Sequence, residues 1–327
     1  EAATNSLILL NKTETQNISD FNGIGFDFSE YELNRNYYFT KFNIDDVSNL
    51  TVKPIYNIAR QLIVNDSGVF QVVNDINTAY QDLDPRVNST NMIQTSGYPI
   101  VNKYTSEGDY VYTWLYNSGI RRNGISLNLN TIDSNNNTYL VNNYASALDI
   151  DNNGSVDTPF NNSVNLSITK YSASGDNLWT KVLLSENGSL DFSKIQTDAN
   201  DDLIVFGYFN GNVRFNPNSN EITTSTTNLD GTFQQNYFIA KYNTNGELLW
   251  VNTLIEYISF YSYAYENVVI DNDNNIYVMG TLVANDTTTV DIDPRDDFAF
   301  YVNLQNTGSY PIFIKYDAQG NIAFAKV

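Results

Sequence analysis

The chain contains no cysteine and no histidine among its 327 residues. Without cysteine there are no disulfides, no thiol nucleophiles and no thiolate ligands for zinc. Without histidine the commonest general base and transition-metal ligand is missing. Basic residues are scarce too, with 17 Lys and Arg against 37 Asp and Glu, and a negative field repels nucleic acids. We therefore expect no nucleic-acid partner, whereas a basic or polar protein or a divalent cation suits this charge.

Long apolar runs are also absent, because no stretch approaches the roughly 18 uninterrupted apolar residues of a membrane-spanning helix. The chain is nevertheless rich in core-forming residues, with 42% hydrophobic and 14% aromatic residues, mostly Tyr and Phe, which favour strands. It begins Glu-Ala-Ala-Thr-Asn-Ser without an initiator Met. We interpret this start as a mature form after removal of an export signal.

An apolar residue, a lysine and an aromatic residue recur together five times along the chain. The separations between the lysines are 62, 67, 71 and 74 residues, for Lys41, Lys103, Lys170, Lys241 and Lys315. A polar turn and a second apolar stretch follow each copy, most clearly in NYFIAKYNTNGELLWVNTL at 236–254. Such self-similarity at a fixed order indicates a repeat architecture.

Each repeat contains two further patterns before its lysine. One is an apolar stretch, a turn of Asp, Asn, Ser or Gly and another apolar stretch, as in NVVIDNDNNIYVMG at 267–280. The other opens a long loop, as in VDIDP at 290–294. Four short antiparallel strands per repeat, A to D, with a long loop between B and C, are typical of a propeller blade. We predict an all-β protein that is one domain, a five-bladed β-propeller with blades at 1–57, 58–117, 118–184, 185–255 and 256–327; the alternative is an open array.

The order IDNDNNIYVMG, VDIDP and FIAKYNTNGELLW resembles the bacterial β-propeller repeats often called SBBP repeats. These repeats read as an Asp turn with Asn-x-Tyr-Val-x-Gly, then Val-Asp-Phe-Asp-Pro, Phe-x-x-Lys-aromatic and Gly-x-x-x-Trp. The match is good over blades two to five and poor over blade one. Two departures are Arg214, which replaces the first Asp of its copy, and Phe324, which stands where Trp179 and Trp250 stand. The resemblance implies an exported protein of the periplasm or cell surface, with little assigned catalysis.

One loop matches the front of a calcium-binding loop. Oxygen-bearing side chains occupy alternate positions in Asp149, Asp151, Asn153, Ser155 and Asp157. Gly154 stands at the sixth position, but Phe160 stands where the bidentate Glu of a complete loop belongs. One hypothesis is that this loop binds Ca²⁺, and the alternative is that it is a solvated polar loop.

Structural roles are expected for most other recurring polar and aromatic residues. Because the lysine recurs five times, it suits a blade-to-blade hydrogen bond or an ion pair with a recurring Asp. We expect Asp271 and Asp273 to shape a turn, and Asp291 and Asp293 to cap strand ends or tie down the long loop. The tryptophans should pack between blades, with sugar stacking as the alternative: Trp114, Trp179 and Trp250.

The most unusual loop is the aromatic run ISFYSYAYE at 258–266. If the aromatic side chains of this run are exposed, they would form a contact site, and if they are covered, they would be part of the core. The residues concerned are Phe260, Tyr261, Tyr263 and Tyr265. The sequence shows no Ser–base pair, phosphate loop or zinc motif, so we predict no enzymatic activity.

Together these features predict an exported binding or scaffolding propeller. We expect it to be an accessory subunit of a bacterial cell-envelope or outer-membrane secretion or transport complex, docking a protein partner through loops on one face. The alternatives are a surface carbohydrate-binding propeller, using the aromatic run, and a glycosidase with paired carboxylates in its channel.

Overall fold

The computed structural model describes short blocks of the chain, and the statements below concern these residues only. They are 6–12, 37–43, 51–55, 59–65, 67–75, 80–82, 92–94, 99–115, 130–144, 165–185, 187–216, 222–224, 235–254, 258–259, 268–284, 289–293, 300–304 and 306–327. All of their regular structure is β-strand, and none of them forms a helix that would cross a membrane. The chain divides into two compact units, of which the first comprises Glu1–Arg121, Ser134–Asn136 and Ala173–Gly175 and the second the remainder.

The first unit contains two antiparallel sheets. Sheet 1 has the order β1-β2-β3, with β1 at Ser6–Lys12, β2 at Tyr37–Asn43 and β3 at Thr51–Ile55. Sheet 2 has the order β4-β5-β8-β9, with β4 at Ala59–Val64, β5 at Phe70–Asp75, β8 at Pro99–Tyr104 and β9 at Tyr110–Leu115. Between β5 and β8, a small ribbon pairs β6 at Tyr80–Asp82 with β7 at Met92–Gln94.

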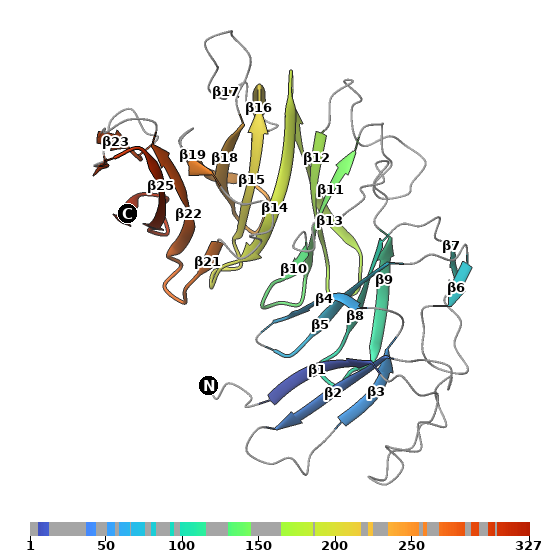
Figure 1. The fold of residues 1–327 in the computed structure, drawn as a ribbon. Helices are drawn as coiled ribbons and strands as arrows, with labels where there is room; N and C mark the ends of the chain where they lie inside the picture. Colours follow the sequence, from blue (N-terminus) through green and yellow to red (C-terminus); the bar gives the residue numbers. More distant parts are fainter. Residues whose placement is uncertain are drawn as a thin grey trace. The chain divides into compact units, whose positions relative to one another are not determined.

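The second unit contains three sheets, which stand side by side in chain order (Figure 1). Sheet 3 comprises β10 at Asn130–Ile132, β11 at Thr138–Tyr144, β12 at Asn165–Tyr171 and β13 at Asn177–Ser185. Sheet 4 comprises β14 at Ser189–Thr197, β15 at Leu203–Asn210, β18 at Asn236–Tyr242 and β19 at Leu248–Leu254. Sheet 5 comprises β21 at Val268–Ile270, β22 at Ile276–Ala284, β25 at Gly308–Tyr316 and β26 at Ile322–Lys326, with β20 at Ile258–Ser259 also paired to β22.

Two ribbons follow the second strands of sheets 4 and 5. One pairs β16 at Asn212–Arg214 with β17 at Thr223–Thr224, and β16 also pairs with the end of β13 in sheet 3. The other pairs β23 at Thr289–Asp291 with β24 at Tyr301–Asn303. These ribbons occupy the stretches where the sequence predicts a long loop between strands B and C.

The predicted four-stranded antiparallel repeat is confirmed in sheets 2 to 5, each of which runs A to D in sequence order. The recurring lysine lies on strand C in every sheet: β2, β8, β12, β18 and β25. Sheet 1 shows three described strands, which correspond to B, C and D because β2 carries Lys41. The ring of five blades and its closure stay predictions at this point.

Two layers of apolar side chains hold the second unit together. Sheets 3 and 4 share one core, in which Val141 and Ile168 meet Val205, Phe238 and Ala240. Sheets 4 and 5 share another, in which Phe206 and Ile239 meet Val278, Ile312 and Ile314. Alternate residues of sheet 4 thus face opposite neighbours, as the two-residue period of a strand requires. We call these two layers the 3/4 seam and the 4/5 seam.

Candidate functional site

The recurring lysine is part of a buried ion pair in the middle sheets. In sheet 4, Lys241 Nζ lies 2.7 Å from Asp198 Oδ2 and 3.2 Å from Asp202 Oδ2. In sheet 3, Lys170 Nζ lies 3.2 Å from Asp133 Oδ2. The aspartates belong to the turn between strands A and B, so each pair ties this turn to strand C of the same sheet. The predicted recurring Asp partner is confirmed, and the ion pair lies within one sheet.

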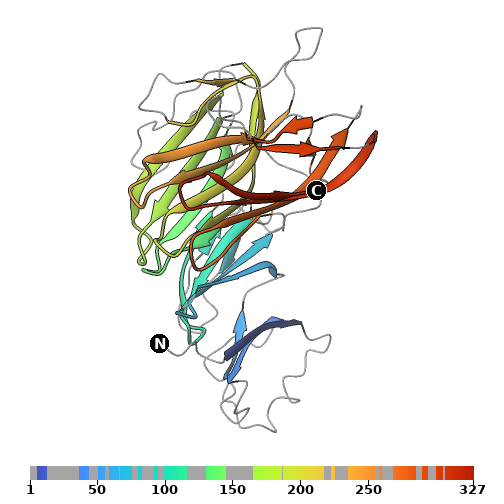
Figure 2. The same cartoon turned by 90° about the vertical axis from the view of Figure 1, so that its left-hand side faces the viewer.

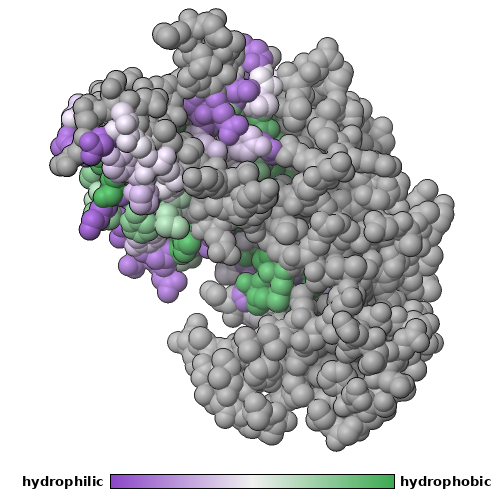
Figure 3. All heavy atoms as spheres, in the orientation of Figure 1, coloured by the Kyte–Doolittle hydropathy of each residue, from purple (hydrophilic) through white to green (hydrophobic). Residues whose placement is uncertain are grey.

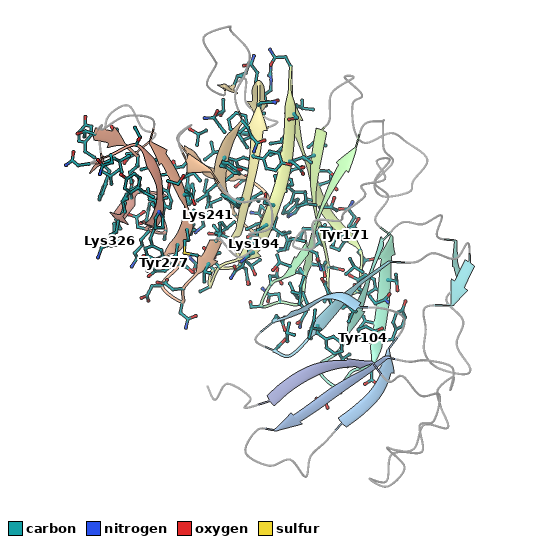
Figure 4. The ribbon with its side chains drawn as sticks, viewed as in Figure 1. Tyr104, Tyr171, Lys194, Lys241, Tyr277 and Lys326 are labelled. Atoms are coloured by element: carbon teal, nitrogen blue, oxygen red, sulfur yellow. The ribbon has the colours of Figure 1, made fainter. Side chains whose placement is uncertain are left out.

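The link between sheets is made by hydrogen bonds to one carbonyl of the next C–D turn. Lys170 Nζ and Trp179 Nε1 of sheet 3 both donate to Thr244 O of sheet 4, at 3.3 and 3.0 Å. Trp250 Nε1 of sheet 4 donates to Ala318 O of sheet 5 at 3.2 Å. Figure 4 labels Lys241 within this stack of sheets. The predicted blade-to-blade hydrogen bond of the lysine is therefore confirmed for Lys170.

The tryptophans differ in position, although all three lie on strand D. Trp179 and Trp250 stand directly opposite the recurring lysines, in register with Lys170 and Lys241. Opposite Lys103 stands Tyr112, and Trp114 pairs with Val101 instead. Packing between sheets is confirmed for Trp179 and Trp250, and the side chain of Trp114 lies outside the described residues. An alignment of the repeats on tryptophan alone would place Trp114 opposite the recurring lysine. The strand pairing shows that Tyr112 occupies this position.

In the first unit, the recurring lysine of sheet 2 is also buried and hydrogen-bonded. Lys103 Nζ donates to Ala173 O at 3.2 Å and also to Asn136 O, and all three residues belong to that unit. Lys103 is 2% exposed and lies 5.7 Å from the centre of the Tyr112 ring. The recurring lysine is thus a structural residue in sheets 2, 3 and 4.

Sheet 5 departs from this pattern at its A–B turn. Asp271 accepts hydrogen bonds from the Asn275 side chain at 2.8 Å and from the Tyr277 hydroxyl at 2.8 Å. Its backbone partners are the N–H groups of Asp273 and Asn275, which confirms the predicted turn role. These hydrogen bonds, that from the Asn275 side chain above all, lower the pKa of Asp271 to about 2. Lys315 Nζ lies over the Tyr277 ring, 5.3 Å from its centre.

Asp291 ties down the start of the long loop of sheet 5. Its Oδ1 accepts the backbone N–H groups of Asp293 at 3.1 Å and of Phe300 at 2.8 Å. The backbone of Ile292 also donates to Phe300 O at 2.9 Å. The predicted role of this recurring Asp in fixing the loop is confirmed, and its carboxylate is engaged by the backbone.

The B–C connections of the second unit share one end of the sheets. The last B–C pairs are Tyr144 with Asn165 in sheet 3 and Ala284 with Gly308 in sheet 5. Figure 1 shows β16, β17 and β23 at this end, opposite the A–B turn between β21 and β22. In the sequence, acidic residues outnumber basic ones in all five B–C connections: 13–36, 76–98, 145–164, 211–235 and 285–307. We call the three B–C connections of the second unit, 145–164, 211–235 and 285–307, the loop face.

The residues chosen from sequence as ligand sites lie outside the described residues. This holds for the calcium candidates Asp149, Asp151, Asn153, Ser155 and Asp157. It also holds for the aromatic candidates Phe260, Tyr261, Tyr263 and Tyr265. Within the described blocks, no group of three or more acidic side chains would hold a metal ion. Both hypotheses therefore stay predictions.

Several buried acids and phenols of the described sheets form hydrogen bonds within the fold. Asp191, which is 5% exposed, accepts the Tyr208 hydroxyl at 2.7 Å. Burial raises the pKa of Tyr139, as do nearby carboxylates beginning with Asp133, and its hydroxyl donates to Asp201 O. Burial likewise raises the pKa of Tyr242, whose hydroxyl donates to Phe215 O at 3.0 Å. These phenols stay protonated at neutral pH and act as structural donors.

Comparison with known proteins gives limited information. No protein-family model matches the chain. The uncharacterized WD repeat-containing protein L264 of Acanthamoeba polyphaga mimivirus is 34% identical over 84 residues, which is 26% of this chain and 6% of that protein. The chain therefore matches only a small part of that relative's length. A solved structure of a protein of unknown function from Bacteroides caccae covers 88% of this chain and 89% of its own at 8% identity, with a TM-score of 0.28, too low to inform the fold.

Proposed function

We propose that this chain is a five-bladed β-propeller that acts as a non-enzymatic docking module. The observation that carries the proposal is that the recurring residues and the long connections of the repeat have different roles. The recurring charged and aromatic residues hold turns and sheets together, as Lys241 and Trp250 do. The B–C connections are the longest connections of the repeat, and scaffold loops of this kind commonly carry binding function.

The repeat architecture supports the propeller. A propeller blade is a sheet of four antiparallel strands, and the blades pack face to face. WD repeats form such blades. The short match to a WD repeat-containing protein agrees with this architecture. Five copies of the lysine motif correspond to five blades.

The loop face suits a basic partner. Its three connections carry an excess of acids, and complementary charge across an interface speeds association and selects the partner. In line with the SBBP-like motifs, we place the protein in the periplasm or at the cell surface. There it would serve as an accessory subunit of an envelope complex.

The test is a capture experiment with matched variants. The full chain is immobilised and exposed to a detergent extract of its native envelope, and retained proteins are identified by mass spectrometry. We expect retention of a basic protein that is weakened by Asp296→Asn with Asp297→Asn on the loop face and unaffected by Glu247→Gln on a C–D turn. Equal retention by both variants, or binding only to a glycan array, would overturn the docking role of the loop face.

A further inference from the structure

The ribbon of β23 and β24 presents one polar and aromatic face to solvent. Tyr301 is 63% exposed, and Thr289 and Asn303 are exposed too. Register places Asp291 opposite Tyr301 and Thr289 opposite Asn303, so the four side chains share one face, which we call the ribbon face. Val302 points the other way, because it is 9% exposed and belongs to the core of the 4/5 seam. The core thus anchors the ribbon from behind.

The ribbon face is part of the loop face of the second unit. Figure 1 shows β23 at the end of sheet 5 where the B–C connections lie, and Figure 2 turns the red strands of sheet 5 toward the viewer. In Figure 3 the coloured residues in the region of β23 are mostly pale to purple, so they are hydrophilic rather than apolar. An exposed aromatic ring in such surroundings suits a charged or polar partner.

The carboxylate of Asp291 is fixed through one oxygen and offers the other. Its Oδ1 accepts the backbone N–H groups of Asp293 at 3.1 Å and of Phe300 at 2.8 Å. Among the residues that the structure describes, Oδ2 has no hydrogen bond or ion pair. The charge is therefore held in place before a partner arrives, which reduces the cost of ordering it on binding.

The ring of Tyr301 stands directly across the ribbon from this carboxylate. Opposite residues of an antiparallel pair have Cβ atoms about 4.5–5.5 Å apart. Within the described blocks, no hydrogen bond or ring contact engages Tyr301. An aromatic face attracts a cation, and the neighbouring carboxylate attracts the same cation. The pair therefore offers two attractive groups to one positively charged side chain.

We propose that the ribbon face binds an arginine side chain of the basic partner, an inference that rests on the docking role proposed above for the loop face. The guanidinium stacks on the ring of Tyr301 and donates a hydrogen bond to Asp291 Oδ2. Arginine suits both groups, because its planar head stacks on aromatic rings while its N–H groups point outward in the plane. The connection 285–307 carries five acids and one basic residue, so its charge also favours a cation.

The ribbon of sheet 4 lacks this site, although it belongs to the same repeat. VRFNP at 213–217 aligns with VDIDP at 290–294, so Arg214 occupies the position of Asp291. The structure agrees with this alignment, because the residues that follow, Phe215 and Ile292, are 2% and 0% exposed. Sheet 4 thus places a cation where sheet 5 places a carboxylate, and like charges disfavour an arginine there.

The test measures peptide binding by the full chain and its variants. Fluorescent hexa-arginine and hexa-lysine peptides are titrated at one fixed ionic strength and followed by anisotropy. Tyr301→Leu keeps apolar bulk without the aromatic face, and Tyr301→Phe keeps the ring. We expect the parent chain to bind hexa-arginine at least about threefold more tightly than hexa-lysine. Tyr301→Leu should abolish this preference, and Tyr301→Phe should retain it.

The carboxylate has a matched control in the same connection. Asp291→Asn keeps the side-chain oxygen that accepts the two backbone N–H groups and removes the charge. Asp286→Asn removes one charge from the same connection. We expect Asp291→Asn to weaken hexa-arginine binding at least about threefold more than Asp286→Asn does. Equal losses from these two variants would show general attraction to acidic loops and overturn the arginine site.

The remaining outcomes also decide the proposal. A Tyr301→Leu variant that retains the preference for hexa-arginine would overturn it. If a variant changes the β-sheet circular dichroism, 4-fluorophenylalanine at position 301 replaces the substitutions, and its ¹⁹F signal should shift with hexa-arginine and stay in place with hexa-lysine. An unshifted signal with both peptides would contradict the site.

The capture experiment separates this proposal from the docking role itself. Retention of a basic protein that depends on Asp296 and Asp297 but is unchanged by Tyr301→Leu would overturn the arginine site alone. Retention that none of these substitutions alters would overturn the docking role of the loop face. Retention that all of them weaken supports both proposals.

Discussion

Sheets 4 and 5 are built from the same repeat but differ in how they use it. In sheet 4 the lysine has a buried ion pair, and the strand-D tryptophan bonds to the next turn. In sheet 5, Lys315 rests over Tyr277 instead, and Phe324 replaces the tryptophan. The repeat thus encodes the position of the lysine, whereas the A–B turn of the same sheet determines whether the lysine has an ion pair.

The largest expected effect comes from the lysine of the middle sheet. Lys241→Met leaves Asp198 and Asp202 without their cation in a buried setting, and we expect it to lower the free energy of unfolding by about 3–5 kcal/mol. Among the described residues, Lys315→Met removes a cation–π contact with Tyr277 and should cost about 1 kcal/mol or less. Urea denaturation of both variants measures the difference, and equal losses would contradict the contrast between the two sheets.

Truncation compares a covered residue of the 4/5 seam with an exposed residue of sheet 5. Ile239→Ala in the 4/5 seam should lower the free energy of unfolding by about 2–5 kcal/mol. Phe313→Ala, at a side chain that is 39% exposed, should cost about 1 kcal/mol or less. Urea denaturation measures both losses, and equal losses would contradict the contrast between the two positions.

Exchange of the strand-D aromatics has a smaller effect. Trp250→Phe removes the hydrogen bond to Ala318 O and part of the contact with Gly320, at a cost of about 1–2 kcal/mol. Phe324→Trp should have less effect, because the Phe324 side chain is 43% exposed. Thermal melts of both variants provide the measurement. Equal losses of melting temperature for the two variants would contradict the larger structural role of Trp250.

The pH dependence of stability tests the A–B turn of sheet 5. The folded-state pKa of Asp271 is about 2, below the ordinary value of 3.8, so its carboxylate stabilises the fold above about pH 4. That contribution disappears as the pH falls through about 2. Asp271→Asn should therefore flatten the rise of stability between pH 2 and 4 in urea titrations. An unchanged slope would show that the turn does not hold the carboxylate in its charged form.

Metal removal is expected to have the smallest effect. If the loop at 149–157 binds Ca²⁺, EDTA lowers the melting temperature and added Ca²⁺ restores it, because a ligand that binds the folded state stabilises it. Asp151→Asn with Asp157→Asn should abolish the response. A melting temperature that is indifferent to EDTA in the parent chain would eliminate the calcium hypothesis.

Much of the fold follows from the sequence, because strand order leaves a local signature. Alternating apolar residues on either side of Asn243-Thr244-Asn245-Gly246 predict the C–D hairpin that the structure shows between β18 and β19. The partner of Lys241 is harder to predict, since Asp198 lies 43 residues earlier in the chain and register alone brings them together. The role of Tyr112 is difficult to predict for the same reason. Trp114 is the same residue type as Trp179, but Tyr112 occupies the equivalent position in the strand pairing.

The candidate ligand sites are less predictable than the fold. Asp149 and Tyr261 lie in connections whose composition varies from repeat to repeat, so no periodicity constrains their geometry. Acidic residues in such loops suit cations and basic proteins alike. Sequence reasoning thus identifies the connections that are candidates for ligand binding and leaves the ligand to experiment.

The most direct test of the seam account is the reactivity of a thiol placed in the 4/5 seam. Phe206→Cys, at a side chain 4% exposed, is compared with Leu249→Cys, at a side chain 49% exposed. If sheet 5 covers sheet 4, Phe206→Cys reacts with a maleimide at least about 100-fold more slowly than Leu249→Cys, because reaction requires local opening. Labelling of Phe206→Cys as fast as that of Leu249→Cys would contradict the account.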